Sequence, residues 1–420
     1  MRIGFFISFP FHREILAPIH AQLEPDFPCL FTSDVEQIIA FQPHVLVVSD
    51  RFLPQYREKL AATILIYTRH GFISKNYSWG VFGEADFVCV SSPWVRDDSA
   101  RRGWRPQMGF WVTGFTLLDK VLAARQAGKA PALPSGFSRR GPTLLYAPTF
   151  NPLLNSIEML GTNWIRRLRE RHPNLNVILK PHPHTAEHHP KGLAILRELA
   201  ASNERTWLVP ADANIYELMP MAGMLMSDAS SVPFYYLAWD RPVILVTNPR
   251  RFEEPRFFDP EGQEWTWRDM AVEIDHADAL PAAFQSCVDH PEEKAERRAF
   301  YRERVFGNNL TGDAAARIAS KVRALARPSA EDQPWVEIAW NSCGAIRRLQ
   351  RRVTALDPTG ARSQVVVDLE KYPQLRAAVK QRPGLRAELA KVVESALRAR
   401  SGAPSSTETF PPEPIDVRNH

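Results

Sequence analysis

The chain has 420 residues, of which 45% are hydrophobic and 24% charged, and its formal net charge is +5. This composition is typical of a globular protein with buried cores and is long enough for two or three domains. The mild positive charge is compatible with an anionic substrate or an acidic membrane surface, and we expect no nucleic-acid partner.

Four cysteines lie far apart, and no pair has the spacing of a metal or redox motif: Cys29, Cys89, Cys287 and Cys343. This pattern predicts buried thiols in a reducing cytoplasm rather than a disulfide framework. The apolar start of the chain is broken by Pro10, so we interpret it as a strand and not as a secretory signal. No stretch approaches the ~20 apolar residues of a membrane span, and we expect any membrane contact to be peripheral.

Short apolar runs alternate with helical patterns along two successive parts of the chain. The first part predicts buried strands at 3–8, 44–49, 63–68 and 87–92, a weaker strand at 110–114, and a helix around 15–23. The second part predicts strands at 143–148, 176–181, 206–210, 223–228 and 242–247, with helices between them such as 163–172. Such alternation is typical of parallel sheets covered by helices, so we expect an α/β fold with two Rossmann-like domains.

The domains are predicted at 1–123 and 143–325, joined by a linker at 124–142 that is rich in Pro, Gly, Ser and basic residues. Residues 326–400 are expected to form a helical extension, starting with an amphipathic helix from Trp335 to about Ala355. Its arginine-rich face at 347–352 could contact anionic lipid or simply be solvated. The tail at 401–420 is rich in Pro, Ser and Thr, which predicts disorder.

One candidate site follows the strand that ends at Asp228. Ser230 or Ser231 can cap the next helix, and Pro233 suits its first turn. A helix start of this kind presents free N–H groups and two hydroxyls, which suits the phosphates of a nucleotide diphosphate. The alternative is an ordinary capped helix. Asp228 could orient a histidine or a ribose, or serve only as a cap.

A second candidate site follows the strand at 176–181. Lys180 could neutralise a phosphate, and His182 could donate to a phosphoryl oxygen or protonate a leaving group. The alternative is a polar loop of exposed histidines. His184, His188 and His189 also allow a metal site, but no carboxylate or cysteine accompanies them at a recognised spacing, so we predict no metal site.

A third candidate site follows the strand at 63–68 of the first domain. His70 precedes Gly71, which permits a sharp turn that presents the imidazole. Facing the second domain across a cleft, His70 would suit a general base for an acceptor hydroxyl, and Lys75 would add positive charge. The alternative is an ordinary turn.

Two further residues have weaker cases. Thr149 ends a strand where it could meet the cleft or serve as a turn residue. His12 follows the first strand, where a loop would meet the cleft, and a surface histidine is the favoured interpretation.

Five short segments between residues 60 and 325 occur in a set order: His70-Gly71 with Lys75, Val112-Thr113-Gly114 with Asp119, LYAPT at 145–149, Lys180 with His182-Pro183, and Ser227-Asp228 with Ser230-Ser231. In this order they resemble the CDP-glycerol glycerophosphotransferase family, the TagF/TagB-type polymerases and primases of teichoic acids and some capsules. Residues 306–318 are similar to the closing segment of that family. The sequence departs from the family's usual pattern at Phe72-Ile73 and Phe115-Thr116.

The resemblance implies a GT-B architecture, in which two Rossmann-like domains with parallel sheets face each other across a cleft. It places the acceptor on the first domain and a CDP-polyol donor on the second. It also implies that His70 and His182 are the essential catalytic residues and that the Ser230-Ser231 turn binds the donor phosphates.

We therefore predict a transferase that moves glycerol phosphate or a related polyol phosphate from a CDP-activated donor to a hydroxyl acceptor, releasing CMP. The acceptor would be a polysaccharide or a lipid-linked chain in the synthesis of a cell-surface polymer. Two alternatives remain open: a glycosyltransferase of the same fold that uses a sugar nucleotide, and a non-catalytic scaffold. The sequence contains no Asp-x-Asp motif, so no resident cofactor is expected, although Mg²⁺ could bridge the donor phosphates.

Overall fold

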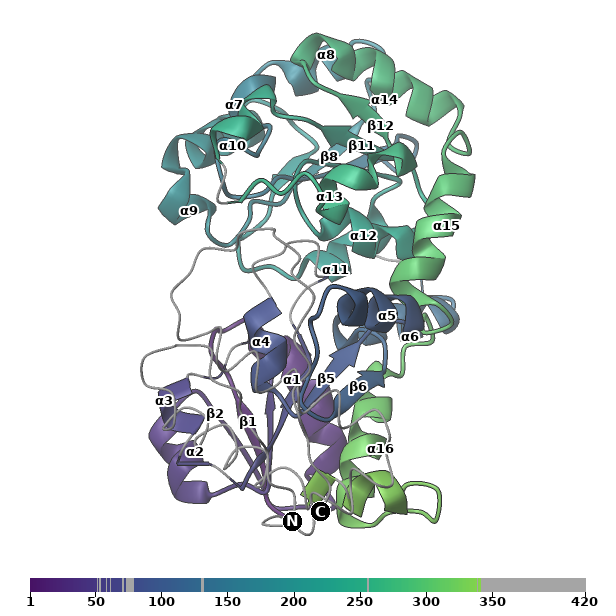
Figure 1. The fold of residues 1–420 in the computed structure, drawn as a ribbon. Coiled ribbons are helices and arrows are strands. Elements are labelled where there is room, and N and C mark those ends of the chain that lie inside the picture. Colours follow the sequence, from purple (N-terminus) through teal and green to yellow (C-terminus); the bar gives the residue numbers. More distant parts are fainter. Residues whose placement is uncertain are drawn as a thin grey trace, which may run out of the picture.

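The computed structural model describes residues 1–50, 52, 54–57, 59–60, 62–69, 72, 79–129, 132–254, 257–337 and 339–340. These residues form two α/β domains, each built around a six-stranded sheet in which all the paired strands are parallel. Figure 1 shows the first domain below the second, with helices on both sides of each sheet. The predicted two-domain α/β fold is confirmed.

The first sheet has the strand order β2-β1-β3-β4-β5-β6. Its strands are β1 (Ile3–Phe6), β2 (Cys29–Thr32), β3 (Val45–Val48), β4 (Ile64–Tyr67), β5 (Phe87–Val90) and β6 (Gly109–Val112). The helices of this part of the chain are α1 (His12–Leu23), α2 (Val35–Phe41), α3 (Pro54–Arg57), α4 (Trp79–Glu84), α5 (Pro93–Arg101) and α6 (Thr116–Gln126). Because α6 continues to Gln126, the predicted linker at 124–142 begins inside a helix.

The second sheet has the strand order β12-β11-β10-β7-β8-β9. Its strands are β7 (Thr143–Ala147), β8 (Asn176–Leu179), β9 (Thr206–Leu208), β10 (Met224–Ser227), β11 (Val243–Val246) and β12 (Val272–Ile274). The helices that follow are α7 (Ile157–Leu160), α8 (Trp164–Arg169), α9 (Thr185–His188), α10 (Pro190–Ala201), α11 (Ile215–Leu218), α12 (Val232–Tyr236), α13 (Gln263–Thr266), α14 (Leu280–Asp289), α15 (Ala295–Phe306) and α16 (Ala314–Ala326). Short 3₁₀ turns lie at Met219–Met221, Leu237–Trp239, Pro249–Glu253, Arg268–Met270 and Ala277–Ala279.

The central strands are the ones that the apolar runs predicted. Every residue of β1, β3, β4, β5, β7, β8, β10 and β11 is buried, since helices cover both faces of a parallel sheet. Two strands at sheet edges, β2 and β12, were not predicted from the sequence. Both strands are short, and their residues are largely half-exposed.

Aromatic side chains join the two domains. Phe72 of the first domain packs on Phe234 of the second with ring centroids 4.8 Å apart, and Phe115 packs on Tyr235 at 4.9 Å. Trp94 lies 5.2 Å from Trp267 in the same interface. Because these rings belong to one buried apolar cluster or pack against it, the interface resembles a domain core and holds the two sheets in a defined relation.

The last two helices cross back from the second domain to the first. Helix α15 runs down beside the second domain to the upper end of the first, and α16 lies against the first domain (Figure 1). The buried side of α16 includes Ala315, Ile318 and Val322, and it packs in the core of the first sheet together with Ile15 and Ile19 of α1. The predicted second domain extends to residue 325, and this boundary is wrong for α16, which packs on the first domain. The apolar stripe of α16 predicts a packed helix but does not say which domain it covers.

Two segments of the family pattern meet where α16 begins. Asp119 of α6 accepts hydrogen bonds from the N–H groups of Ala314 (3.0 Å) and Ala315 (2.8 Å). Gly114 has a φ of +93°, and a Cβ atom there would lie 3.2 Å from the carbonyl oxygen of Asn309. These contacts attach the closing segment at 306–318 to the first domain.

Replacing Asp119 with alanine should therefore lower the free energy of unfolding by about 1–2 kcal/mol, because the first N–H groups of α16 lose their acceptor. The midpoint of urea unfolding measures this change. Asp313→Ala is the matched control, since Asp313 precedes α16 without capping it and forms an ion pair with Arg317 at the helix surface. Equal losses in the two variants would contradict the capping role of Asp119.

The start of the predicted helical extension packs on the first domain. Trp335 contacts the rings of Phe87 and Trp111, and the indole N–H of Trp340 donates to the carbonyl oxygen of Leu325 (2.8 Å). The rest of that extension and the predicted disordered tail, residues 341–420, lie outside the described residues. Among the residues that are described, no helix has both the length and the apolar character that crossing a bilayer would need.

Candidate active site

The strand order of the second sheet defines where a ligand would bind. If β7 to β12 are numbered 1 to 6 along the chain, the strands read from β9 lie in the order 3-2-1-4-5-6. This is the strand order of a dinucleotide-binding sheet. The strand order reverses between β7 and β10, so the loops that follow these two parallel strands diverge at the carboxyl edge of the sheet. Ligands of such sheets bind in this crevice. The candidate residues Thr149, His182, Asp228, Ser230 and Ser231 all follow β7, β8 or β10.

Asp228 connects the loops that follow β10 and β7. Its side chain is 1% exposed. One carboxylate oxygen accepts from the N–H of Thr149 (2.8 Å), and the other accepts from the N–H and the hydroxyl of Ser156 (both 3.0 Å). Burial raises the pKa of Asp228 to about 7, while these three donors act in the opposite direction. Both oxygens are therefore occupied, and Asp228 serves to hold the β7 loop against the β10 loop.

The buried Asp228 should make stability depend on pH. An unfolded aspartate releases its proton near 3.8, whereas the folded state keeps this proton up to about 7. Raising the pH through this window therefore favours the unfolded state, and stability falls. We expect the midpoint of urea unfolding to decrease between pH 4 and pH 7 relative to Asp228→Asn, which lacks the titration.

At pH 7 the same variant should lose about 1–3 kcal/mol of stability, because the asparagine NH₂ would face the N–H of Ser156 and leave buried donors without an acceptor. Ser156→Ala provides a comparison, since it removes one donor and keeps the carboxylate. The midpoints of urea unfolding of the wild type and Asp228→Asn are compared at each pH. If their difference stays the same from pH 4 to pH 7, the assignment of a raised pKa to Asp228 is contradicted.

The two serines predicted to bind phosphate lie at the start of α12. Ser230 and Ser231 are half-exposed, and Pro233 occupies the first turn as predicted. The hydroxyl of Ser230 accepts from the N–H of Val232 (3.2 Å), and the side chain of Ser231 makes no capping bond. The hydroxyls thus remain near the surface, directly after the buried Asp228.

His182 lies at the same edge, after β8, and is half-buried. The N–H of His184 donates to Nδ1 of His182 (3.2 Å), so the neutral ring carries its proton on Nε2. Phe150, which follows Thr149 in the β7 loop, packs on this ring with centroids 5.0 Å apart. The β7 loop therefore contacts the β10 loop through Thr149 and the His182 loop through Phe150.

Lys180 differs from the expectation of an open phosphate ligand. Its side chain is buried, and its ammonium group donates to the carbonyl oxygens of Pro181 (2.8 Å) and Ala211 (2.7 Å). Burial lowers the pKa of Lys180 to about 8. The ammonium group thus joins the loops after β8 and β9, and its charge lies within the carboxyl edge of the sheet.

The weaker candidates have clear positions. Thr149 is buried, and it contributes its backbone N–H to Asp228. His12 is fully buried at the start of α1, with the rings of Phe9 and Phe11 edge-on to its imidazole. The expectation of a surface histidine at position 12 is therefore wrong, because the neighbouring aromatic rings cover it.

His70, Gly71 and Lys75 lie outside the described residues. The residues on either side of the His70-Gly71 pair are described. Arg69 is buried with a φ of +64°, and its guanidinium lies over the ring of Phe82. Phe72 packs on Phe234 of α12, three residues after Ser231.

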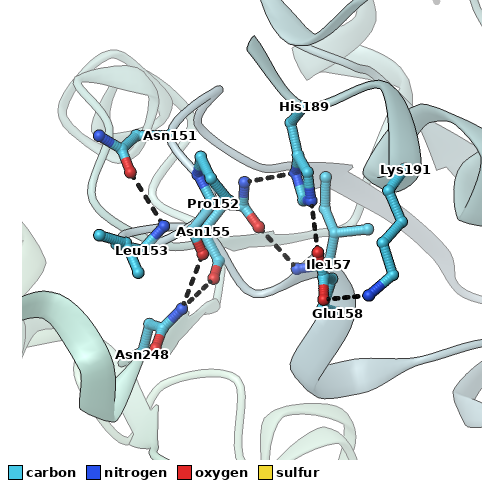
Figure 2. Close-up of polar contacts among 9 residues, drawn as sticks. All are labelled: Asn151, Pro152, Leu153, Asn155, Ile157, Glu158, His189, Lys191 and Asn248. Carbon is cyan, nitrogen blue, oxygen red and sulfur yellow. Dashed lines mark hydrogen bonds and ion pairs between the residues drawn. The ribbon is translucent and has the colours of Figure 1, made fainter.

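A polar network that the sequence did not predict holds the β7 loop (Figure 2). His189 is buried, and its ring contacts Asn155 (3.0 Å) and Glu158 (2.9 Å), while Lys191 donates to the other oxygen of Glu158 (2.7 Å). Asn248 donates to the carbonyl oxygens of Pro152 and Asn155 from the opposite side, as Figure 2 shows. The repeated asparagines after β7 are a signal of a turn-rich loop, but nothing in the sequence pairs them with His189.

Three side chains around α9 form a further cluster. His184 Nδ1 and His188 Nε2 lie 3.8 and 3.7 Å from the same oxygen of Glu187. The sequence analysis named no carboxylate at a recognised spacing beside these histidines, and the structure places Glu187 near both of them. The contact of Glu187 with His184 depends on the helical turn between them.

Comparisons with known proteins agree with this architecture. The wall teichoic acid polymerase TagF, in a crystal soaked with CDPG, has a TM-score of 0.58 and 13% identity over 77% of this chain and 88% of that chain. A putative UDP-N-acetylglucosamine 2-epimerase from Listeria monocytogenes has a TM-score of 0.54 and 14% identity over 78% of this chain and 97% of that chain. At these identities the likeness shows the fold alone, which is GT-B-like.

A family model gives the sequence-level match. It is described as CDP-Glycerol:Poly(glycerophosphate) glycerophosphotransferase and matches residues 31–323, which is more than two thirds of the chain. A comparison of the sequence with curated proteins found no match. The extent of the family match shows that this chain belongs to the CDP-glycerol:poly(glycerophosphate) glycerophosphotransferase family and is a transferase of that type.

Proposed function

We propose that the protein transfers glycerol phosphate from CDP-glycerol to a hydroxyl group of a cell-surface polymer or its lipid-linked precursor. The observation that carries this proposal is the meeting of the β8, β7 and β10 loops at one edge of the second sheet. This edge bears His182, Ser230 and Ser231, while Asp228 and Phe150 hold the loops together. Family membership supports the donor.

In the proposed reaction an acceptor hydroxyl attacks the distal phosphorus of the donor in line with the leaving group. The new O–P bond forms as the bond from that phosphorus to the bridging oxygen breaks, and CMP leaves. His70 accepts the proton of the acceptor hydroxyl, and the Nε2–H of His182 with the two serine hydroxyls stabilises the phosphoryl oxygens. Positioning and charge stabilisation supply most of the catalysis of phosphoryl transfer.

The contact between Phe72 and Phe234 supports a role for His70 across the interface. Phe72 follows His70 by two residues, and Phe234 follows Ser231 by three. Lys180 contributes positive charge from within the sheet edge and positions the β8 loop through its two carbonyl contacts.

Mg²⁺ on the donor phosphates is compatible with this chemistry, but Asp228 does not fit as its ligand. Both oxygens of Asp228 are occupied by N–H and O–H donors of the protein. Peripheral attachment to an anionic membrane is part of the proposal, with the arginines at 347–352 as the contact; these residues lie outside those described.

Product analysis tests the proposed function. The purified full-length chain is incubated with CDP-glycerol, CDP-ribitol, UDP-sugars or GDP-sugars and an acceptor, and the released nucleotide is identified. Release of CMP from CDP-glycerol is expected, whereas release of UDP or GDP would establish a glycosyltransferase instead. A thermal-shift screen accompanies it: a true donor at 100 times its dissociation constant stabilises by about 2.7 kcal/mol. Stabilisation without any turnover would indicate the non-catalytic scaffold.

A further inference from the structure

The cluster of His184, Glu187 and His188 has the chemistry of a transition-metal site. His184 and His188 are four residues apart around α9, so their rings lie on the same side of one helical turn. All three side chains offer a ligand atom, and these atoms lie within 4.8 Å of one another. Two imidazoles and one carboxylate are a ligand set that suits Zn²⁺.

The distances are close to those of a bound ion. Glu187 Oε2 lies 3.8 Å from His184 Nδ1 and 3.7 Å from His188 Nε2. Around a tetrahedral Zn²⁺ with bonds of about 2.0–2.2 Å, neighbouring ligand atoms are about 3.3–3.6 Å apart. Shifts of a few tenths of an ångström at these two contacts, with a small rotation that brings the imidazoles together, would complete the three-ligand geometry.

The surroundings of the cluster position its histidines. The ring of Phe150 packs against the rings of His184 (5.9 Å) and His188 (5.3 Å), forming one wall of the cluster. The next residue, His189, is buried and is held by Asn155 and Glu158, as Figure 2 shows, which fixes the end of α9. His184 and His188 remain 45% and 48% exposed, so an ion can reach them from solvent.

We propose that His184, Glu187 and His188 bind a divalent transition-metal ion of the Zn²⁺ class at the surface beside the candidate active site. The rings of His182 and His184 are 5.4 Å apart, so the ion would lie next to His182. Three protein ligands leave a fourth position for water or for a phosphoryl oxygen. This proposal rests on the cluster alone and not on the proposed transfer reaction.

Competition titration tests the proposal directly. Zn²⁺ is titrated into the full-length protein in the presence of a chromophoric chelator, and Co²⁺ spectra report the ligand geometry. One tightly bound ion per chain is expected. His184→Ala and His188→Ala should each weaken binding by at least about 10-fold, since removing a ligand costs no less than removing a group that supports one. Glu187→Gln should also weaken it. Circular dichroism of each variant checks that the fold is kept.

The matched control is His290→Ala. His290 is an exposed histidine whose ring lies 3.8 Å from Glu292, and no group of three ligands among the described residues includes it. Its loss should leave the affinity for Zn²⁺ unchanged. Failure of the wild type to bind Zn²⁺, or equal affinity in His184→Ala, His188→Ala and the wild type, would overturn the proposal. Zn²⁺ binding and CMP release are measured separately. Loss of the metal proposal would therefore leave the proposed transfer reaction untouched, and loss of the transfer reaction would leave the metal proposal untouched.

Discussion

Replacing His182 with asparagine is expected to slow glycerophosphate transfer by about 10²–10³-fold while the protein stays folded. His182 accepts a hydrogen bond at Nδ1 from the N–H of His184. The amide oxygen of asparagine can take over this acceptor role, but asparagine has no donor at the position of Nε2. The loss of a single preorganised donor to a developing anionic oxygen typically has an effect of this size.

The rate is measured as CMP released per enzyme at saturating CDP-glycerol, together with the affinity for the donor. His182→Gln is a useful second variant, because glutamine can place an amide N–H near the position of Nε2 and should recover part of the rate. His276→Asn is the control, since His276 is exposed and pairs with Asp275 away from the β8 loop. If His182→Asn keeps turnover within about threefold of wild type, His182 has no role in stabilising the transition state.

Replacing His70 with alanine is expected to reduce transfer by about 10²–10⁴-fold, which is the usual contribution of a positioned general base. The affinity for CDP-glycerol should change little, because the proposed contact of His70 is with the acceptor hydroxyl. The prediction rests on the His-Gly segment of the family pattern and on the packing of Phe72 against Phe234.

Two measurements separate catalysis from structure at position 70. If His70 is the base, the acid limb of the profile of kcat/KM against pH should flatten in His70→Ala, and added imidazole should restore part of the rate. His44→Ala serves as a structural comparison in the same domain, since His44 accepts from the N–H of Arg2 and lies at the other end of the first sheet. Wild-type turnover in His70→Ala would remove this residue from the mechanism.

In the proposed reaction the two histidines act on the same step from different domains, which would make the interface between the domains part of the catalytic apparatus. Phe72, Trp94 and Phe115 of the first domain pack on Phe234, Tyr235 and Trp267 of the second. Two of these partners, Phe234 and Tyr235, belong to α12, which begins directly after Ser231. The first domain therefore packs directly against the helix that presents the proposed phosphate ligands.

Local sequence pattern was sufficient for the central strands and for the order of the chemical segments. Runs such as residues 45–48 and 243–246 are apolar throughout because both faces of the strand are covered, and this can be recognised without knowing the fold. Strands β8 and β10 place His182, Asp228 and Ser230 after their carboxyl ends, where open α/β sheets bind ligands. Edge strands β2 and β12 were not predicted, because they are short and most of their residues are partly exposed.

Contacts between residues far apart in the chain needed the folded structure. The stripe of Ile318 and Val322 is equally suited to either domain, and only the contact with α1 assigns α16 to the first. The carboxylate of Asp228 finds its donors 72 and 79 residues away, in Ser156 and Thr149. A hydrophobic pattern records how much of a side chain is buried, whereas a polar side chain acquires its partner, and hence its pKa and its role, only when the chain brings that partner close.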